Sequence, residues 1–350
     1  MEKIFAPDYN RIVNAALNRK GEIPLYEHNI HDDVISSITG RDTEALLKEG
    51  DQSSLEEYFK IRADFHIAHG YDCYSFEGCI TDLVQQGAGL MGHGVSLIKT
   101  EADFNSWPWN EQPNRYFEKF GPMFNAIRKT LPPGMKIIGG VGNGMFETMQ
   151  DFVPFTELCY LEIDNPDLFS QLWKKIEESF LLIWKQFLEN WSDILAIGRF
   201  GDDLGFKAST LIKPDTIREH VIPAYKNIVS LVHSHDMPFL LHSCGSIFDV
   251  MEDIITITGI DAKHSNEDEI APMTEWLERY GSRIGNFGGV DMNVLCLEDE
   301  AGIKSYVTER YHEMLEYPGT AIGSGNQIAD YVPPENFQTM VKTVRELRRF

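Results

Sequence analysis

Short apolar runs alternate along this chain with longer segments in which apolar residues recur every three or four positions. Runs of the first kind are typical of buried strands, and segments of the second kind are typical of amphipathic helices. The clearest helical segments span residues 166–191 and 214–235, and each begins with a Pro-Asp pair suited to a first helical turn. The pattern predicts eight strands, within residues 23–27, 71–76, 136–141, 194–200, 238–242, 259–264, 283–289 and 319–325.

Strand and helix alternate throughout the chain, an order typical of parallel βαβ units. Eight such units in 350 residues predict an α/β fold, a single (β/α)8 TIM barrel over residues 1–350 with an extra N-terminal helix at residues 8–20. A doubly wound open sheet is the alternative, because strand order cannot be read from the sequence. No linker rich in Pro, Gly or Ser divides the chain, so one domain is expected.

Composition narrows the class of partner. The formal net charge of −23 disfavours nucleic acids and anionic membrane surfaces. No apolar stretch is long enough to span a membrane, and the N-terminal segment lacks the apolar centre of a secretory signal. The five cysteines are odd in number and widely spaced, which favours reduced thiols over a disulfide framework. We therefore expect a cytoplasmic protein.

One short stretch, "LLHSCGSI", combines an imidazole with a thiol. His242 closes the fifth predicted strand and Cys244 follows two residues later, so an extended chain would place both side chains on one face. Imidazole nitrogen and thiolate sulfur are preferred ligands of Zn²⁺. An isolated pair of this kind is more often a buried histidine packed beside a small buried cysteine, so its surroundings decide its meaning.

Polar residues follow the other predicted strands as well. Each has a simple explanation by itself, since Asp, Asn and Ser favour turns and helix N-termini. Together they predict a pocket for metal binding or acid–base chemistry, because barrel active sites lie at the carboxyl ends of the strands. These residues are Glu27, His28, Glu77, Asp202, Asp203, His264, Asn266, Asp291, Ser324 and Asn326.

Several of these strand ends lie within longer motifs. The run "GDDLGFKASTLIKPDTIREHVIPAYKNIVSLVHSHDMPFLLHSCGSI" is followed by "GIDAKHSNEDEIAP", "RIGNFGGVD" and "SGNQIADYVPPEN". In their order, these motifs resemble the uroporphyrinogen decarboxylase superfamily, and in particular its branch of cobalamin-linked methyltransferases. The resemblance covers most of the chain and implies a (β/α)8 barrel, in agreement with the pattern of strands and helices.

The methyltransferases of this superfamily use zinc to activate a methyl donor or acceptor, while a separate corrinoid protein carries the methyl group on its cobalamin. The resemblance implies that His242 and Cys244 are two of the zinc ligands. The third departs from the pattern, because coenzyme M methyltransferases have a cysteine where this chain has Ser324, and serine is a poor zinc ligand. The candidates to complete the site are Glu27, Glu77 and His264.

The resemblance thus implies transfer of a methyl group between a small O-, N- or S-methyl compound and a corrinoid protein. Demethylation of an ether or amine fits the missing cysteine better than thiol methylation does. Asp203 or Glu27 would then protonate the leaving group, and His264 is a further catalytic candidate. The expected substrate-binding residues are His28, Glu77, Asp202, Asn266, Asp291, Ser324 and Asn326.

Two alternatives stay open. True uroporphyrinogen decarboxylases have an arginine-rich motif near the first strand, where this chain has Glu27 and His28 and no visible cation. We therefore predict that uroporphyrinogen, with its eight carboxylates, is neither bound nor decarboxylated. The second alternative is a barrel that binds a small ligand without turning it over. The segment "DFHIAHG", from Asp64, approaches a corrinoid-binding signature, but its pattern predicts a helix, so cobalamin is expected on the partner.

Overall fold

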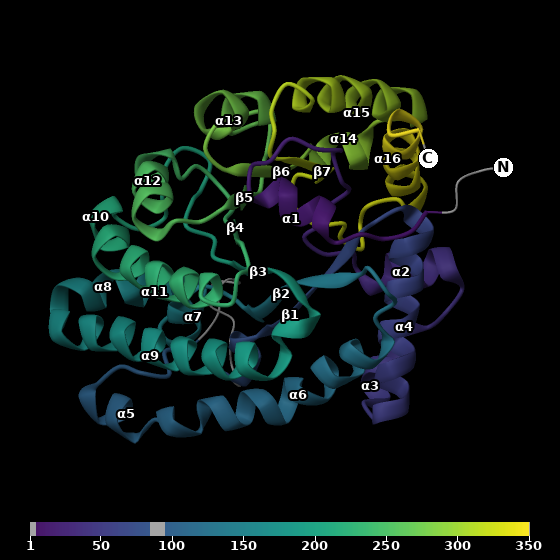
Figure 1. Cartoon of the computed structure of the whole chain (residues 1–350). Coiled ribbons are helices and arrows are strands. Elements are labelled where there is room, and N and C mark those ends of the chain that lie inside the picture. Colours follow the sequence, from purple (N-terminus) through teal and green to yellow (C-terminus); the bar gives the residue numbers. More distant parts are fainter. Residues whose placement is uncertain (1–4, 85–94, 350) are drawn as a thin grey trace.

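Seven parallel strands form the centre of the computed structural model, which describes residues 5–84 and 95–349. The strands lie side by side in the order in which they occur along the chain. They curl around a common axis with helices on the outside, as Figure 1 shows, and the predicted α/β barrel is confirmed. The strands are β1 (Cys73–Cys79), β2 (Lys136–Gly142), β3 (Leu195–Gly201), β4 (Phe239–His242), β5 (Ala262–His264), β6 (Gly285–Val290) and β7 (Thr320–Ser324).

The first of the eight predicted strands differs from the prediction. Residues 23–27 are not a full strand and pair with β7 through one parallel bridge, Leu25 to Ile322. The backbone of this segment comes so close to β7 that a Cβ on Gly323 would lie 1.6 Å from the carbonyl oxygen of Tyr26. On the β1 side, the Glu27 carbonyl accepts a hydrogen bond from the Ser75 hydroxyl (2.6 Å), so a side chain takes the place of a backbone ladder.

Helices surround the strands, and the segments predicted as helical are helical. The "DFHIAHG" stretch ends α4, which stops at Gly70 in the left-handed conformation that favours glycine. Among the described residues, none of the helices is both long and apolar enough to cross a membrane. The helices are α1 (Asn10–Ala16), α2 (Asp32–Thr39), α3 (Thr43–Glu49), α4 (Gln52–His69), α5 (Glu101–Ser106), α6 (Gln112–Thr130), α7 (Met145–Phe152), α8 (Phe155–Asp164), α9 (Pro166–Trp191), α10 (Pro214–Thr216), α11 (Ile222–His233), α12 (Phe248–Asp253), α13 (Met273–Tyr280), α14 (Met292–Leu297), α15 (Glu300–Met314) and α16 (Pro334–Leu347).

Apolar side chains from the strands fill the barrel, and α1 closes its amino end. This interior cluster includes Ile197 and Phe287, and it continues into Ala15 of α1. The carbonyl of Ala15 lies so near the amino ends of β6 and β7 that a Cβ on Gly285 or Gly319 would approach it to 2.7 or 2.9 Å. The carboxyl ends of the strands are left open, and the polar residues predicted from the sequence lie there.

Candidate functional site

Two histidines end neighbouring strands and share a hydrogen bond. His242 and His264 face each other in the register of β4 and β5, and their Nδ1 atoms lie 2.7 Å apart. His264 Nε2 lies 3.0 Å from the Ser324 carbonyl oxygen, which can only accept, so this nitrogen carries a hydrogen. Burial lowers the pKa of His264 to about 3, so its ring is neutral and its Nδ1 accepts. His242 therefore donates from Nδ1 and keeps a lone pair on Nε2.

The free nitrogen of His242 faces a thiol and a carboxylate. Its Nε2 lies 3.4 Å from Cys244 Sγ and 3.8 Å from Asp203 Oδ1. The same Asp203 oxygen accepts a hydrogen bond from the backbone N–H of Cys244 (3.0 Å). The loops after β3 and β4 can meet here because Gly245 has φ of 80° and a Cβ on it would come within 2.1 Å of Gly205. Burial raises the pKa of the Cys244 thiol well above its usual range.

Two sets of three side chains could hold a metal ion within the described ranges, and both include His242. One set adds Asp203 and Cys244, and the other adds His28 and His264. In the second set the rings of His28 and His242 stack with centroids 3.8 Å apart and 17° between planes. Nitrogen lone pairs lie in the ring plane, so stacked rings do not direct them at one ion. The first set offers nitrogen, sulfur and oxygen donors of the kinds that zinc binds.

The residues suggested from the sequence as a third ligand are engaged elsewhere. Glu77 forms an ion pair with Arg199, and both nitrogens of His264 lie within hydrogen-bonding distance of other groups. Glu27 accepts hydrogen bonds from the hydroxyl and the backbone N–H of Ser324. Asp203 is instead the carboxylate that lies beside His242 and Cys244. From the sequence, Asp203 was expected only as a proton donor.

Glu27 is buried, with 4% of its surface exposed. The Tyr71 hydroxyl donates to it at 3.4 Å, in addition to the two donors of Ser324. Desolvation outweighs these hydrogen bonds and raises the pKa of Glu27 to about 8, so the carboxyl group keeps its proton at neutral pH. Ser324, the position at which the resemblance would place a third cysteine, thus holds Glu27.

An arginine that the sequence interpretation missed lies at the centre of the barrel mouth. Arg199, in β3, is 2% exposed, and its Nε donates to Glu77 Oε1 at 2.6 Å. Its Nη1 faces three oxygens, the hydroxyls of Tyr26 (3.0 Å) and Ser75 (2.9 Å) and the carbonyl of His28 (3.0 Å). A signal was present in the sequence, because a charged residue interrupts the apolar strand "ILAIGRF".

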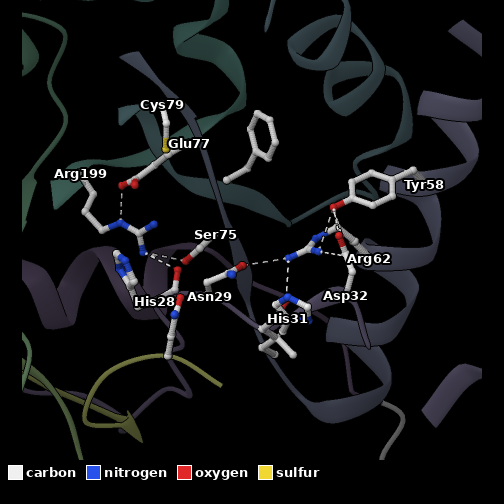
Figure 2. Close-up of a pocket in the computed structure, with 13 residues that line it drawn as sticks. His28, Asn29, His31, Asp32, Tyr58, Arg62, Ser75, Glu77, Cys79 and Arg199 are labelled. Atoms are coloured by element: carbon white, nitrogen blue, oxygen red, sulfur yellow. Dashed lines mark hydrogen bonds and ion pairs between the residues drawn. The ribbon is translucent and has the colours of Figure 1, made fainter. Parts of the chain in front are cut away.

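A pocket of about 330 Å³ opens beside Arg199. Figure 2 shows a second arginine across it, Arg62 of α4, which forms an ion pair with Asp32 at 2.5 Å. The expectation of no cation near Glu27 and His28 is therefore wrong, because strands and helices distant in sequence bring two guanidinium groups there. The pocket is lined by His28, Asn29, Ile30, His31, Asp32, Tyr58, Arg62, Ser75, Phe76, Glu77, Cys79, Arg199 and Gln327.

Two of the predicted substrate-binding carboxylates have backbone partners. Asp202 is fully buried and accepts from the first turn of α7, with N···O distances of 3.0 and 2.8 Å, and from the Tyr225 hydroxyl at 2.5 Å. Burial raises the pKa of Asp202 to about 6. Asp291 caps α14 by accepting the N–H of Asn293 at 2.7 Å. Both carboxylates hold local structure around the mouth.

Two of the predicted substrate-binding residues are asparagines, Asn326 and Asn266. Asn326 Nδ2 lies 3.5 Å from Cys244 Sγ. Asn266 is 4% exposed, and its side-chain oxygen and nitrogen have no hydrogen-bond partner among the described residues. An amide left in this state costs free energy unless a ligand or water completes it, which is consistent with the predicted substrate contact.

Comparison with known proteins agrees with this barrel. Residues 94–347 match the sequence pattern of the uroporphyrinogen decarboxylase (URO-D) family. A methyltransferase from Methanosarcina mazei shares the fold at a TM-score of 0.74 and 18% identity, covering 98% of this chain and 99% of that one. The putative vitamin-B12-independent methionine synthase from Listeria monocytogenes is similar at a TM-score of 0.51 and 13% identity, covering 99% and 98%. None of the curated proteins matches this chain.

Proposed function

This chain belongs to the uroporphyrinogen decarboxylase family, and from that premise we propose that it is a methyltransferase that moves a methyl group between a small methylated compound and a separate corrinoid protein. One observation carries the proposal. The hydrogen bonds from His242 through His264 to the Ser324 carbonyl leave the lone pair of His242 Nε2 beside Cys244 and Asp203. The fold shared with the Methanosarcina mazei methyltransferase supports the same assignment.

His242, Cys244 and Asp203 would hold a zinc ion. A metal bound there supplies Lewis-acid chemistry, polarising the oxygen or nitrogen that carries the methyl group. His264 acts as a positioning residue, because its Nδ1 accepts the His242 hydrogen and so fixes the tautomer that a metal ligand needs. Cys244 must give up its thiol proton on binding the metal, so zinc binding releases a proton.

Glu27 would supply the proton for the leaving group. Its pKa of about 8 keeps the carboxyl group protonated at neutral pH, as a general acid requires. Its neighbour in the chain, His28, lines the pocket and stacks on His242. The Glu27 carboxyl group accepts from Ser324, whose carbonyl accepts from His264, the hydrogen-bond partner of His242.

Uroporphyrinogen decarboxylation fits this site less well. The two guanidinium groups of the pocket already have carboxylate partners, Glu77 for Arg199 and Asp32 for Arg62. Each of these ion pairs is neutral overall, so the pocket offers no net positive charge to balance the eight carboxylates of the substrate. The purified protein is expected not to release CO2 from uroporphyrinogen, and stepwise release would favour the decarboxylase instead.

Zinc content tests the metal centre. After loading with zinc and removal of the excess, wild type should hold one ion per chain by atomic emission. Cys244→Ser should weaken zinc affinity at least ~10-fold, measured by competition with a chromophoric chelator, because a soft ligand is lost. Cys159→Ser, at an exposed cysteine, is the matched control and should bind as wild type does. A loaded wild type without zinc, or equal affinities for the two variants, would contradict the proposal.

Methyl transfer is tested with free reduced cobalamin in place of the partner protein. Small methoxy and methylamino compounds serve as donors, and conversion of cobalamin to its methylated form is followed by absorbance. The zinc-loaded wild type should catalyse the conversion with at least one donor class, and Cys244→Ser should lower the rate with that donor. If the Cys244→Ser and wild-type rates were the same, the site would not be the reaction centre.

A further inference from the structure

Arg199 has one edge that the protein does not use. Its Nε donates to Glu77 and its Nη1 is surrounded by three oxygens. No residue that the structure describes accepts a hydrogen bond from its Nη2, and its ion pair with Glu77 is formed through Nε. A guanidinium cannot lose its charge in a protein, and Arg199 Nη2 is not among the fully buried polar atoms that lack a partner, so this N–H group is accessible from the adjoining space and can donate to an acceptor there.

This unused edge adjoins the pocket of about 330 Å³, which Arg199 helps to line. Dashed lines in Figure 2 join Arg199 to Glu77 and Ser75, while Arg62 holds the side-chain oxygen of Asn29 from the opposite side. The Asn29 oxygen accepts that bond at 3.3 Å, and the Asn29 amide nitrogen donates to none of the described residues, so it is a second donor on the pocket wall.

We infer that the pocket binds the carboxylate of a small organic acid on Arg199 Nη2, with Asn29 Nδ2 as a second donor. A monoanion suits this place better than a dianion, because Glu77 and Asp32 also line the pocket and would repel a second negative charge. A carboxylate matches the planar guanidinium edge through charge-assisted hydrogen bonds.

For the methylated end of the ligand, the inference rests on the proposed function. His28 lines the pocket, its carbonyl accepts from Arg199, and its ring stacks on His242 with centroids 3.8 Å apart. A single imidazole ring thus separates the carboxylate site from the proposed zinc ligands. The substrate class is therefore a short carboxylic acid that carries an O- or N-methyl group, with its acid on Arg199 and its methylated atom toward His242.

The experiment uses the full chain, without donor or cobalamin, and benzoate as the probe. Isothermal titration compares benzoate with neutral benzamide and with inorganic phosphate. Wild type should bind one benzoate saturably, and should bind benzamide and phosphate each at least ~10-fold more weakly. Arg199→Lys should weaken benzoate binding at least ~10-fold, since the ammonium group lacks the second N–H edge. Glu77→Gln, which removes a competing charge, should strengthen binding at least ~2-fold.

Controls separate this site from the proposed metal centre. Arg128→Lys, at an arginine paired with Asp193 at 2.8 Å outside the pocket, should bind benzoate as wild type does. Circular dichroism and zinc affinity verify that each variant is folded. Unsaturable benzoate binding to folded wild type, equal affinity for benzamide, or a Glu77→Gln affinity no higher than wild type would overturn the carboxylate site. Normal benzoate binding in a chain that holds no zinc would instead overturn the proposed function and leave this site standing.

Discussion

The imidazole side of the barrel mouth, formed by His242, His264 and Cys244, is neutral, whereas the guanidinium side, formed by Arg199 and Glu77, contains an ion pair. Both sides are buried to a similar degree. Burial lowers the pKa of His242 well below its usual range and raises the pKa of Cys244. The histidine is therefore an uncharged imidazole and the cysteine an uncharged thiol. Arg199 has no such choice, because its guanidinium stays charged and must be surrounded by acceptors.

This difference determines what each side can recognise. On the imidazole side, each neutral ring donates one hydrogen bond, from His242 to His264 and from His264 to the Ser324 carbonyl, which leaves a lone pair on His242 Nε2. A lone pair suits a metal cation that accepts electron pairs. A charged guanidinium with one unused edge suits an anion. His28 joins the two, since its ring stacks on His242 and its carbonyl accepts from Arg199. A ligand that carries both kinds of group would bind both sides at once.

The largest effect is expected when the ion pair is broken. Arg199→Met leaves the Glu77 carboxylate buried without a partner, so the free energy of unfolding should fall by roughly 3–5 kcal/mol in urea denaturation followed by circular dichroism. The double variant Arg199→Met/Glu77→Leu should recover most of that loss, because no lone charge remains. Arg128→Met breaks an ion pair whose side chains are 40% and 59% exposed, and it should cost less than about 1 kcal/mol. Equal losses for the two single variants would contradict the contrast.

An intermediate effect concerns pH and a buried imidazole away from the mouth. Burial lowers the pKa of His66 from 6.5 to about 3, so below pH 6.5 the unfolded chain takes up a proton that the folded chain refuses. The contribution of His66 to the free energy of unfolding is therefore fully present above pH 6.5 and is lost as the pH falls toward 3. The part lost between pH 6.5 and pH 5 is roughly 2 kcal/mol.

Urea midpoints measured across this range check the sign and the size. His66→Gln should flatten the acid-side decline by that amount, and the same substitution at exposed His312 should leave its slope unchanged. The decline that remains in His66→Gln measures the other titrating groups, including the imidazole side. A slope unaffected by His66→Gln would argue that burial does not hold this ring neutral.

The smallest effect tests the hydrogen-bond chain itself. His264→Phe removes the acceptor of the His242 Nδ1 hydrogen, so zinc affinity should fall about 10-fold without loss of a direct ligand. Ser324→Ala is the control, because His264 bonds to the backbone carbonyl of Ser324, and zinc affinity should stay within about 2-fold. Chelator competition measures both variants. An unchanged zinc affinity in folded His264→Phe would show that the tautomer of His242 does not depend on its hydrogen bond to His264.

Part of this site could be predicted because it is local. The two-residue spacing of His242 and Cys244 at a strand end already indicated a shared face, and their sulfur and nitrogen lie 3.4 Å apart. The first predicted strand was less accurate. The apolar run predicted a full strand at residues 23–27, but this segment pairs only with β7, through one bridge. Arg199 was missed for a different reason. Its apolar neighbours indicated a buried strand, and a charged side chain is not expected to point into the interior of a barrel.

The sequence by itself determined the order of strands and helices, because the periods of two and 3.6 residues on which they depend are set by neighbouring residues. It also determined which polar groups would follow the strands. Only the tertiary structure decided which of them meet. Asp203 reaches Cys244 across 41 positions and Arg199 reaches Glu77 across 122, because parallel strands bring their carboxyl ends to one end of the barrel. The lone pair of His242 depends on the register of β4 with β5 and on one carbonyl from β7, which no local pattern encodes.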